Sequence, residues 1–433
     1  MSFLTRGPGE RTLRCSFRPL PSRERGRTVP GVDTGDTAWV LVCAALVMFM
    51  TPGLAFFYGG LVRAKHVVGT IMQSFIALAV VTVLWVLVGY SLAFGPDKAG
   101  LIGGLDFVGL HGVGAAPSAY APTIPATAFM VFQMMFAIIT PALIAGAFAE
   151  RMKFSGYLML IALWSLFVYA PVAHWEWGGG FLGANGVGAL DFAGGAVVHA
   201  NAGAAALATA IYIGRRRGLG TDDMFPHNIP FVVLGAGILW FGWFGFNAGS
   251  ALGANALASS AFVNTQLGAA AAVLTWIVLE RVLTGKVTTI GAATGAVAGL
   301  ATITPAAGYV EPLAALAIGL AAGLLCFWAV SLKSRLGYDD SLDVVGVHMV
   351  GGVIGVLLTG AFASLAINAA GASASLTQVG KQAILAGVTL AFSFVATLAI
   401  LKITDVTVGL RVTEEDEDAG LDASQHGEFA YRT

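Results

Sequence analysis

Long apolar stretches alternate with short polar segments along the chain from residue 38 onward. Most stretches hold about 20 residues or more, enough for an α-helix to cross roughly 30 Å of hydrocarbon. The pattern therefore predicts an all-α polytopic membrane protein with eleven transmembrane helices. We place these helices at residues 38–61, 67–94, 123–149, 155–174, 195–213, 228–248, 260–281, 287–305, 310–333, 344–367 and 380–402.

Basic residues in the connecting segments predict the orientation of the helices. Lysines and arginines follow every odd-numbered predicted helix, whereas the loops between them carry only Lys98 and Lys381. Positively charged loops stay in the cytoplasm, so we expect the N-terminus outside and the C-terminus inside. The basic positions are Arg63, Lys65, Arg151, Lys153, Arg215, Arg216, Arg217, Arg281, Lys286, Lys333, Arg335, Lys402 and Arg411.

The predicted helices form two halves of five, at residues 38–213 and 228–367. Because five is odd, the second half has the opposite orientation, which is the inverted repeat common in transporters. The helix at 380–402 completes a transmembrane domain over residues 38–403.

Polar segments flank this domain. Residues 1–37 are rich in arginine and proline and are predicted to be disordered, although their charge alone would favour a cytoplasmic start. Residues 404–433 form a predicted cytoplasmic regulatory tail with an acidic run, Glu414 to Asp418. Such a run is either a solvated tail or a segment docked on the cytoplasmic loops, with Arg151 and the arginines at 215–217 as candidate partners.

Composition agrees with the membrane prediction. The chain is 57% hydrophobic and 11% charged, unlike a soluble globular protein, and its net charge of −1 argues against a nucleic-acid partner. Several of its 57 glycines recur every four residues, which lets helices approach closely in lipid. These glycines are Gly291, Gly295 and Gly299, the pair Gly319 and Gly323, and the pair Gly351 and Gly355.

Two histidines lie inside apolar segments, each early in the fifth helix of its half. At 1.5 Å per residue, His199 lies about 12 Å beyond Asp191 and His348 about 8 Å beyond Asp343, from opposite sides of the membrane. We therefore expect the two to approach one another near the midplane. A titratable group at this depth usually faces a pathway or a partner, so the pair is predicted to line a conduit. The alternative is that each histidine is a packing residue of the bundle whose hydrogen bonds are satisfied.

The remaining histidines lie at span ends, in loops or in the tail, where solvent contact is expected. Two histidines without a nearby carboxylate or cysteine make a poor metal site. The sequence thus predicts neither a metal site nor a cofactor.

Other candidate residues surround the predicted outer mouth. Asp191 is placed to cap the helix that carries His199. Trp177, next to three glycines, is a candidate cation-binding face, and Ser250 adds a hydroxyl acceptor, whereas Trp175 and Trp240 are expected to be ordinary interfacial residues. For the phenylalanines of this region, packing against lipid or protein is the default explanation.

Several runs together resemble the ammonium transporter (Amt/MEP/Rh) family, in its bacterial Amt-type form, over essentially residues 38–430. The signature-like run is DFAGGAVVHANAGAAALATAIYIGRR, from Asp191 to Arg216. The other runs are FAIITPALIAGAFAER, WFGFNAGSAL, DDSLDVVGVHMVGG and GLRVTEEDEDAGLDASQHGE.

The resemblance implies roles for single residues. Trp177, Phe136 and Ser250 match the outer ammonium-recruitment site, which Asp191 supports. Phe136 and Phe246 match a stacked gate lined by Trp243, and His199 and His348 match the paired pore histidines. One departure is Glu176, which stands where relatives usually have an apolar residue.

The resemblance also implies a homotrimer in the inner (plasma) membrane and a possible cytoplasmic PII signal protein as partner. We therefore predict an ammonium transporter or channel, and not an enzyme, that conducts ammonia after ammonium loses its proton. The alternatives are an ammonium sensor with little flux and a passive channel for another small neutral solute. An intramembrane hydrolase is disfavoured because no Ser or Cys nucleophile accompanies the histidines.

Overall fold

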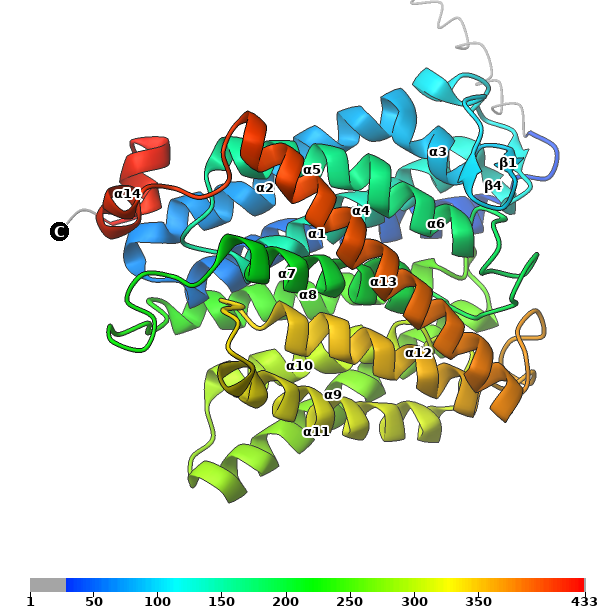
Figure 1. Cartoon of the computed structure of the whole chain (residues 1–433). Coiled ribbons are helices and arrows are strands. Elements are labelled where there is room, and N and C mark those ends of the chain that lie inside the picture. Colours follow the sequence, from blue (N-terminus) through cyan, green and yellow to red (C-terminus); the bar gives the residue numbers. More distant parts are fainter. Residues whose placement is uncertain (1–28, 432–433) are drawn as a thin grey trace, which may run out of the picture.

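Long helices lie side by side along a common direction in the computed structural model, which describes residues 29–431 (Figure 1). The main helices are α1 (Thr34–Leu61), α2 (Val67–Leu84), α3 (Tyr90–Phe94), α4 (Ala126–Ile144), α5 (Phe154–Trp164), α6 (Ala170–Glu176), α7 (Asn201–Ile213), α8 (Ile229–Gly249), α9 (Ala256–Thr284), α10 (Thr289–Ile303), α11 (Pro312–Leu336), α12 (Val350–Phe362) and α13 (Leu376–Thr407). A short helix, α14 (Glu414–Ala419), follows near the C-terminus.

Short π-helical and 3-10 turns join or extend several of these helices. The π segments are η2 (Trp85–Gly89), η5 (Ser165–Tyr169), η6 (Gly195–Ala200), η7 (Val345–Met349) and η8 (Asp422–His426), and the 3-10 turns are η1 (Ala64–His66), η3 (Val108–Leu110) and η4 (Ala145–Ala147). Two small antiparallel sheets between α3 and α4 pair β1 (Asp97–Lys98) with β2 (Ile102–Gly103) and β3 (Pro117–Ser118) with β4 (Ala121–Pro125).

The predicted helices all have counterparts in the described part of the chain. Ten helices there are long and apolar enough to cross a membrane, and the segment predicted at 287–305 is the shorter apolar helix α10. The first helix begins at Thr34 and not near residue 38, because the Asp33 carboxylate accepts the Asp36 N–H at 2.8 Å and caps it. Residues 1–28 of the predicted N-terminal tail lie outside the described residues.

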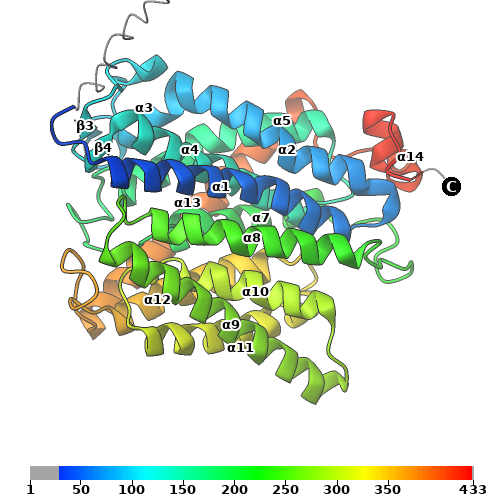
Figure 2. The same cartoon turned by 180° about the vertical axis from the view of Figure 1, so that it is seen from behind.

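The two ends of the bundle differ. We use "tail end" for the end that carries α14 and "loop end" for the end that carries β1 to β4; they lie on opposite sides in both views (Figures 1 and 2). Helix α1 runs alongside α8 between these ends (Figure 2).

Glycines allow helices to pack backbone against backbone. A Cβ on Gly319 of α11 would lie 2.3 Å from the Gly268 carbonyl oxygen of α9, and one on Gly299 of α10 would lie 2.5 Å from the Ala272 Cβ. In α12, a Cβ on Gly355 would meet the Thr302 oxygen at 2.1 Å. The glycine rows predicted to mediate close helix contacts are therefore confirmed.

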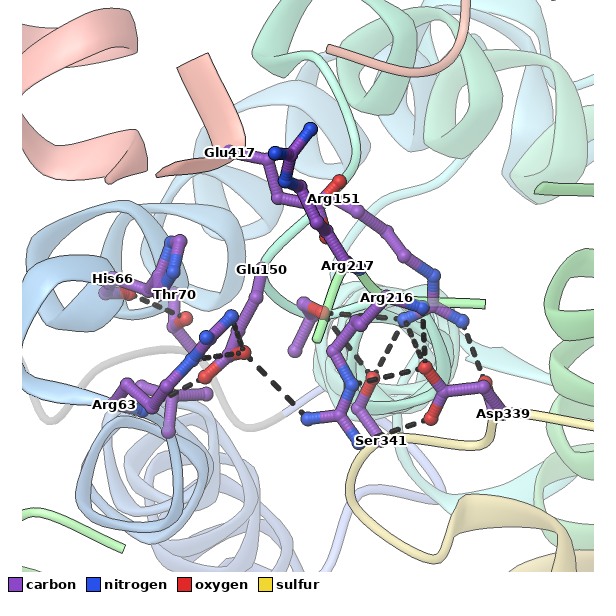
Figure 3. A network of polar contacts seen from close by, with 12 residues as sticks. Arg63, His66, Thr70, Glu150, Arg151, Arg216, Arg217, Asp339, Ser341 and Glu417 are labelled. Carbon is purple, nitrogen blue, oxygen red and sulfur yellow. Dashed lines mark hydrogen bonds and ion pairs between the residues drawn. The ribbon is translucent and has the colours of Figure 1, made fainter. Parts of the chain in front are cut away.

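Charged side chains are concentrated in a network at the tail end (Figure 3). Glu150 accepts hydrogen bonds from the Arg63 backbone N–H at 2.8 Å and its guanidinium at 2.9 Å, and its carboxylate lies 3.6 Å from Arg216. Arg216 also donates to both oxygens of Asp339. The network thus connects the segment after α1, the segment after α4 and the two segments that follow α7 and α11.

Arg151 holds the tail-end loops together from within. Its buried guanidinium donates to the carbonyl oxygens of Ala147, Ala149, Gly214 and Asp339 and to the Ser341 hydroxyl. Burial lowers the pKa of Arg151 to about 10, so the side chain remains charged. These bonds fix the loop that leads into η7.

The C-terminal segment is docked on this end of the bundle. Arg217 pairs with Glu414 and, at 3.0 Å, with Asp418, while Glu417 accepts from the Arg217 N–H at 2.6 Å and from Arg411 at 2.8 Å. Of the two hypotheses for the acidic run, a solvated tail or a docked segment, the structure shows the docked segment. Of the arginines predicted as side-chain partners, Arg217 makes this contact, whereas the Arg151 and Arg216 side chains are engaged within the loops.

Candidate functional site

Two histidines meet in the centre of the bundle. His199 lies in η6 and His348 in η7, and their Nδ1 atoms are 3.2 Å apart. Their rings stack with centroids 5.2 Å apart and an interplanar angle of 20°. Both side chains are buried, so the predicted approach of the two segments is confirmed by this contact.

An aspartate orients each histidine segment. The Asp191 carboxylate accepts four backbone N–H groups, those of Gly194 and Gly195 on one oxygen and of Ala196 and Val197 on the other, at 2.7–3.0 Å. The predicted cap is therefore present. Burial raises the pKa of Asp191, although the four amides act in the opposite direction.

The corresponding cap of the second histidine segment is Asp340, which was not predicted from the sequence. Its carboxylate accepts the Val345 N–H at 2.7 Å. Asp343, the predicted start of this segment, instead has a positive φ of 65° and pairs with Lys333. Equal spacing was the available signal, because His348 follows Asp340 by eight residues, as His199 follows Asp191.

Aromatic rings continue from the histidine pair toward the loop end. The His199 ring stacks on Trp243 at 5.3 Å and on Phe246 at 5.9 Å, and the Trp243 indole donates to the Thr304 hydroxyl at 2.8 Å. Phe136 lies over Phe246 with ring centroids 4.3 Å apart. The two phenylalanines thus form a pair directly beyond the histidines.

A cavity of about 270 Å³ opens on the other side of the phenylalanine pair, near the loop end. Trp177 borders it, held by an indole N–H bond to the Asp191 carbonyl oxygen at 2.9 Å. The Ser250 hydroxyl donates to the Phe246 carbonyl oxygen at 2.9 Å, which leaves its own lone pairs available as acceptors. The lining residues are Phe94, Tyr120, Phe129, Gln133, Phe136, Glu176, Trp177, Phe192, Ser250 and Leu252.

Smaller cavities continue the row toward the tail end. One of about 10 Å³ lies against His199, His348, Trp243 and Phe246, and offers about the room that one water-sized molecule needs. The buried Nε2 of His199 has no hydrogen-bond partner in the described part of the chain. A further cavity of about 40 Å³ begins at His348 and is also lined by Asp343.

All sequence-predicted site residues therefore lie along one row. In order from the loop end, the row passes Trp177, Ser250, Phe136, Phe246, Trp243, His199 and His348, with Asp191 beside its first part. The row runs from the wide loop-end cavity through a nearly closed, apolar middle section to the smaller cavity beyond His348. Such a section admits small neutral molecules far more readily than ions, because a buried unpaired charge is costly.

Two predictions about exposure are wrong. His66 and His174, expected to contact solvent, are buried: the His66 Nδ1 accepts the Leu421 N–H at 3.2 Å, and the His174 ring bonds to Ala93 and Asp97. Trp175 is also buried and donates to the Leu101 carbonyl oxygen at 2.7 Å, so it is not an interfacial residue. In each case a partner distant in sequence covers the ring.

Known proteins resemble most of the chain. The model of the Ammonium Transporter Family matches residues 38–431. The ammonium transporter of Bacillus subtilis (strain 168) is 50% identical over 406 residues, which cover 93% of this chain and 99% of that protein. Amt1 of Archaeoglobus fulgidus is 46% identical over 402 residues, covering 92% and 100%.

Solved structures agree with this likeness. Mep2 of Saccharomyces cerevisiae superposes with a TM-score of 0.86 at 38% identity, covering 93% of this chain and 92% of that chain. A sensor Amt protein superposes with a TM-score of 0.83 at 30% identity, covering 90% and 98%.

Proposed function

Because this chain belongs to the ammonium transporter family, we propose that it takes up ammonium at the loop end and conducts ammonia past His199 and His348. It is a multi-pass protein of the plasma membrane and a transporter rather than an enzyme. The observation that carries the proposal is the nearly closed row of cavities, with the two buried histidines at its centre.

Recruitment takes place in the 270 Å³ cavity. The Trp177 and Phe136 rings, 6.0 Å apart and nearly perpendicular, present aromatic surface to a cation, and Ser250 supplies an oxygen acceptor. Asp191 acts indirectly, because its carboxylate is occupied by backbone amides and its carbonyl holds the Trp177 indole. The Phe136 and Phe246 pair is the gate that ammonium nitrogen must pass next.

Deprotonation of ammonium at the gate costs less free energy than passage of the charged ion through the apolar section. Moving an ammonium-sized ion into dry protein has an idealised cost of order 20 kcal/mol. With an amine reference pKa of about 10.4, deprotonation at pH 7 costs about 3.4 pKa units, or roughly 4.6 kcal/mol. Potassium has no proton to lose, so the same section rejects it.

The histidines supply hydrogen bonds to ammonia in the apolar section. The free Nε2 of His199 borders the 10 Å³ cavity, where one ammonia molecule has room. An imidazole donates at one nitrogen and accepts at the other, so the paired rings can also relay the separated proton. Transport is then electrogenic.

Orientation and assembly follow from charge and family. The tail end, with its cluster of arginines, faces the cytoplasm, and the halves at 38–213 and 228–367 form an inverted repeat. The protein assembles as a homotrimer, and the docked residues 404–433 regulate conduction, with a PII signal protein as a possible cytoplasmic partner.

A sensor function is the second candidate, because a protein described as a sensor Amt protein shares this fold over 90% of the chain. A sensor binds ammonium and conducts little. A passive channel for another neutral solute is the third candidate, and the aromatic cation site argues against it.

The test is simultaneous measurement of current and uptake in proteoliposomes of the purified protein, with methylammonium and potassium compared. We expect saturable uptake with current for ammonium and its methyl derivative, and neither for potassium. Uptake without current would refute the proton relay but keep ammonia conduction. Saturable binding without uptake would instead support the sensor function.

A further inference from the structure

Glu176 is a buried carboxyl group at the recruitment cavity. It is the last residue of α6, directly before Trp177, and it is among the residues that line the same 270 Å³ space. Only 8% of the residue is exposed. Lysine or arginine does not occur among the residues that line this cavity in the described chain.

The carboxyl group has an unused acceptor. The Glu176 Oε2 atom is buried and makes no hydrogen bond within residues 29–431. Asp191, the neighbouring acid, contrasts with it, because both of its oxygens accept backbone N–H groups. Glu176 is therefore the acid at this site with a lone pair free for a ligand.

Two other residues that line the same cavity also carry acceptors. The Gln133 Oε1 atom is buried and also lacks a hydrogen-bond partner in the described residues, and the Ser250 hydroxyl keeps its lone pairs. Ammonium has N–H donors in four directions and no acceptor. A cavity with free acceptors, one of them acidic, beside aromatic faces is complementary to such a cation.

Leaving these acceptors empty is unfavourable. A buried polar group without a partner costs about 1–3 kcal/mol, and more when it is charged. A small cation with several N–H donors removes this cost for each acceptor that it reaches. A neutral solute without spare donors does not.

We propose that Glu176 binds the ammonium ion directly in this cavity and sets its affinity. This inference rests on the proposed function, because it concerns the recruitment step of the same pathway. An apolar residue at this position, which the family resemblance leads one to expect, would leave recruitment to the aromatic rings, Ser250 and Gln133. This chain is thus built to bind external ammonium more tightly than a Glu176→Val version of itself.

The experiment compares methylammonium uptake by Glu176→Gln, Glu176→Asp and Glu176→Val proteins in proteoliposomes. We expect KM to rise about tenfold in Glu176→Gln, the size of one hydrogen bond to a charged group, with the maximal rate within about twofold of the parent. Glu176→Asp keeps a carboxyl group, and its KM should lie between those of the parent and Glu176→Gln. Glu176→Val should raise KM at least as much as the glutamine variant.

The matched control is Glu311→Gln, which removes one carboxylate from the exposed N-terminus of α11, outside the cavity lining. Its KM should equal that of the parent. A Glu176→Gln protein with unchanged KM would overturn the inference, as would a loss confined to the maximal rate.

Calorimetric titration of the purified proteins with ammonium separates this inference from the proposed function. If the parent binds ammonium about tenfold more tightly than Glu176→Gln but shows no uptake, the transport proposal fails and the role of Glu176 stands. If the parent transports and the two bind equally, the role of Glu176 fails and transport stands.

Discussion

At the scale of single residues, the contact between the two histidines assigns opposite roles to their outer nitrogens. The Nδ1 atoms face one another at 3.2 Å, so one ring carries the shared proton and the other accepts it. In neutral imidazoles, the ring that donates at Nδ1 has a bare Nε2, and the ring that accepts at Nδ1 has a protonated Nε2. The pair therefore offers one acceptor and one donor to a molecule that can use both, as ammonia can.

The first prediction removes one member of this pair. In His199→Ala, the ratio of methylammonium uptake to potassium uptake should fall at least about tenfold, because one buried hydrogen-bonding group is lost and the narrowest cavity widens. Tracer uptake into proteoliposomes measures the ratio. His111→Ala, at an exposed loop position, is the control. An unchanged ratio in His199→Ala would remove the histidine from the selectivity mechanism.

The second prediction concerns the cap of the other histidine segment. Burial raises the pKa of Asp340 from 3.8 to about 6. The Asp340 carboxyl group thus binds a proton more tightly in the folded protein than in the unfolded chain. The stability that this group contributes is fully present below its unfolded pKa and is lost as the pH rises through about 6. Asp340→Asn keeps an oxygen acceptor for Val345 and should be more stable than the parent by about 2–3 kcal/mol at pH 7, and by little at pH 4.

Thermal unfolding in detergent, followed by tryptophan fluorescence between pH 4 and pH 8, measures this difference. Asp223→Asn, in an exposed loop, should show no such trend. A difference in Tm between Asp340→Asn and the parent that stays constant with pH would contradict the prediction.

At the scale of elements, η6 and η7 cross closely because glycines line their contact. A Cβ on Gly203 of α7 would lie 2.4 Å from the Met349 N atom, and one on Gly352 of α12 would lie 2.6 Å from the Gly195 carbonyl oxygen. These contacts hold the backbones of the two histidine segments together. The distance between the imidazoles therefore depends on residues that never touch the cavity.

The third prediction follows from this packing. Gly203→Ala should destabilise the protein by about 1–3 kcal/mol, because the added methyl group has no space and the neighbouring backbone must move. It should also reduce methylammonium uptake, since the shift separates the histidines. Tm in detergent and uptake per unit of protein are the two measurements.

Gly237→Ala is the matched control for that change. Gly237 lies in α8 with nothing within 4 Å of the added Cβ, so alanine there should be neutral or stabilising by up to about 1 kcal/mol. Equal Tm values for the two alanine variants would show that the close contact at Gly203 is unimportant.

At the scale of the whole molecule, the C-terminal segment is bonded to loops at the tail end of the bundle. Glu417 bonds to Arg217 and Arg411, and the Lys65 ammonium donates to the Asp418 carbonyl oxygen at 2.7 Å. Through Arg216 and Asp339, the same region continues into the loop before η7 (Figure 3). A change in the docking of the tail should therefore affect the segment that carries His348.

The fourth prediction tests this connection. Glu417 is buried and accepts the Arg217 N–H, but its other partner, Arg411, is a third exposed, so the loss should be smaller than the about 3–5 kcal/mol of a fully buried pair. Glu417→Gln should release the tail, so a protease should cleave it faster, and the maximal uptake rate should change in the same direction as on deletion of residues 409–433.

Glu414→Gln removes the same charge from the exposed face of α14 and should change neither property, because exposed pairs contribute about 0–1 kcal/mol. Unchanged uptake in the deleted protein, at equal protein amounts, would refute a regulatory role for the tail.

The apolar segments, the glycine rows and the Asp191 cap could all be predicted from the sequence. Each is a local property: a span needs length and hydropathy, close packing needs small residues at regular spacing, and a cap needs an acceptor just before a helix. The equal spacing from Asp191 to His199 and from Asp340 to His348 can also be read from the sequence, although the spacing from Asp343 predicts a different start for the second segment.

Only the tertiary structure determines which polar side chains contact one another and which are left without a partner. The 3.2 Å contact of His199 with His348, the burial of His66 and His174, the docking of Glu417 and the free acceptor on Glu176 all join or isolate groups far apart in the chain. Hydropathy specifies that a helix lies in the membrane, whereas the rotation of that helix is set by packing against its neighbours. Rotation determines whether a polar side chain faces a partner, a cavity or lipid, and so it determines the site.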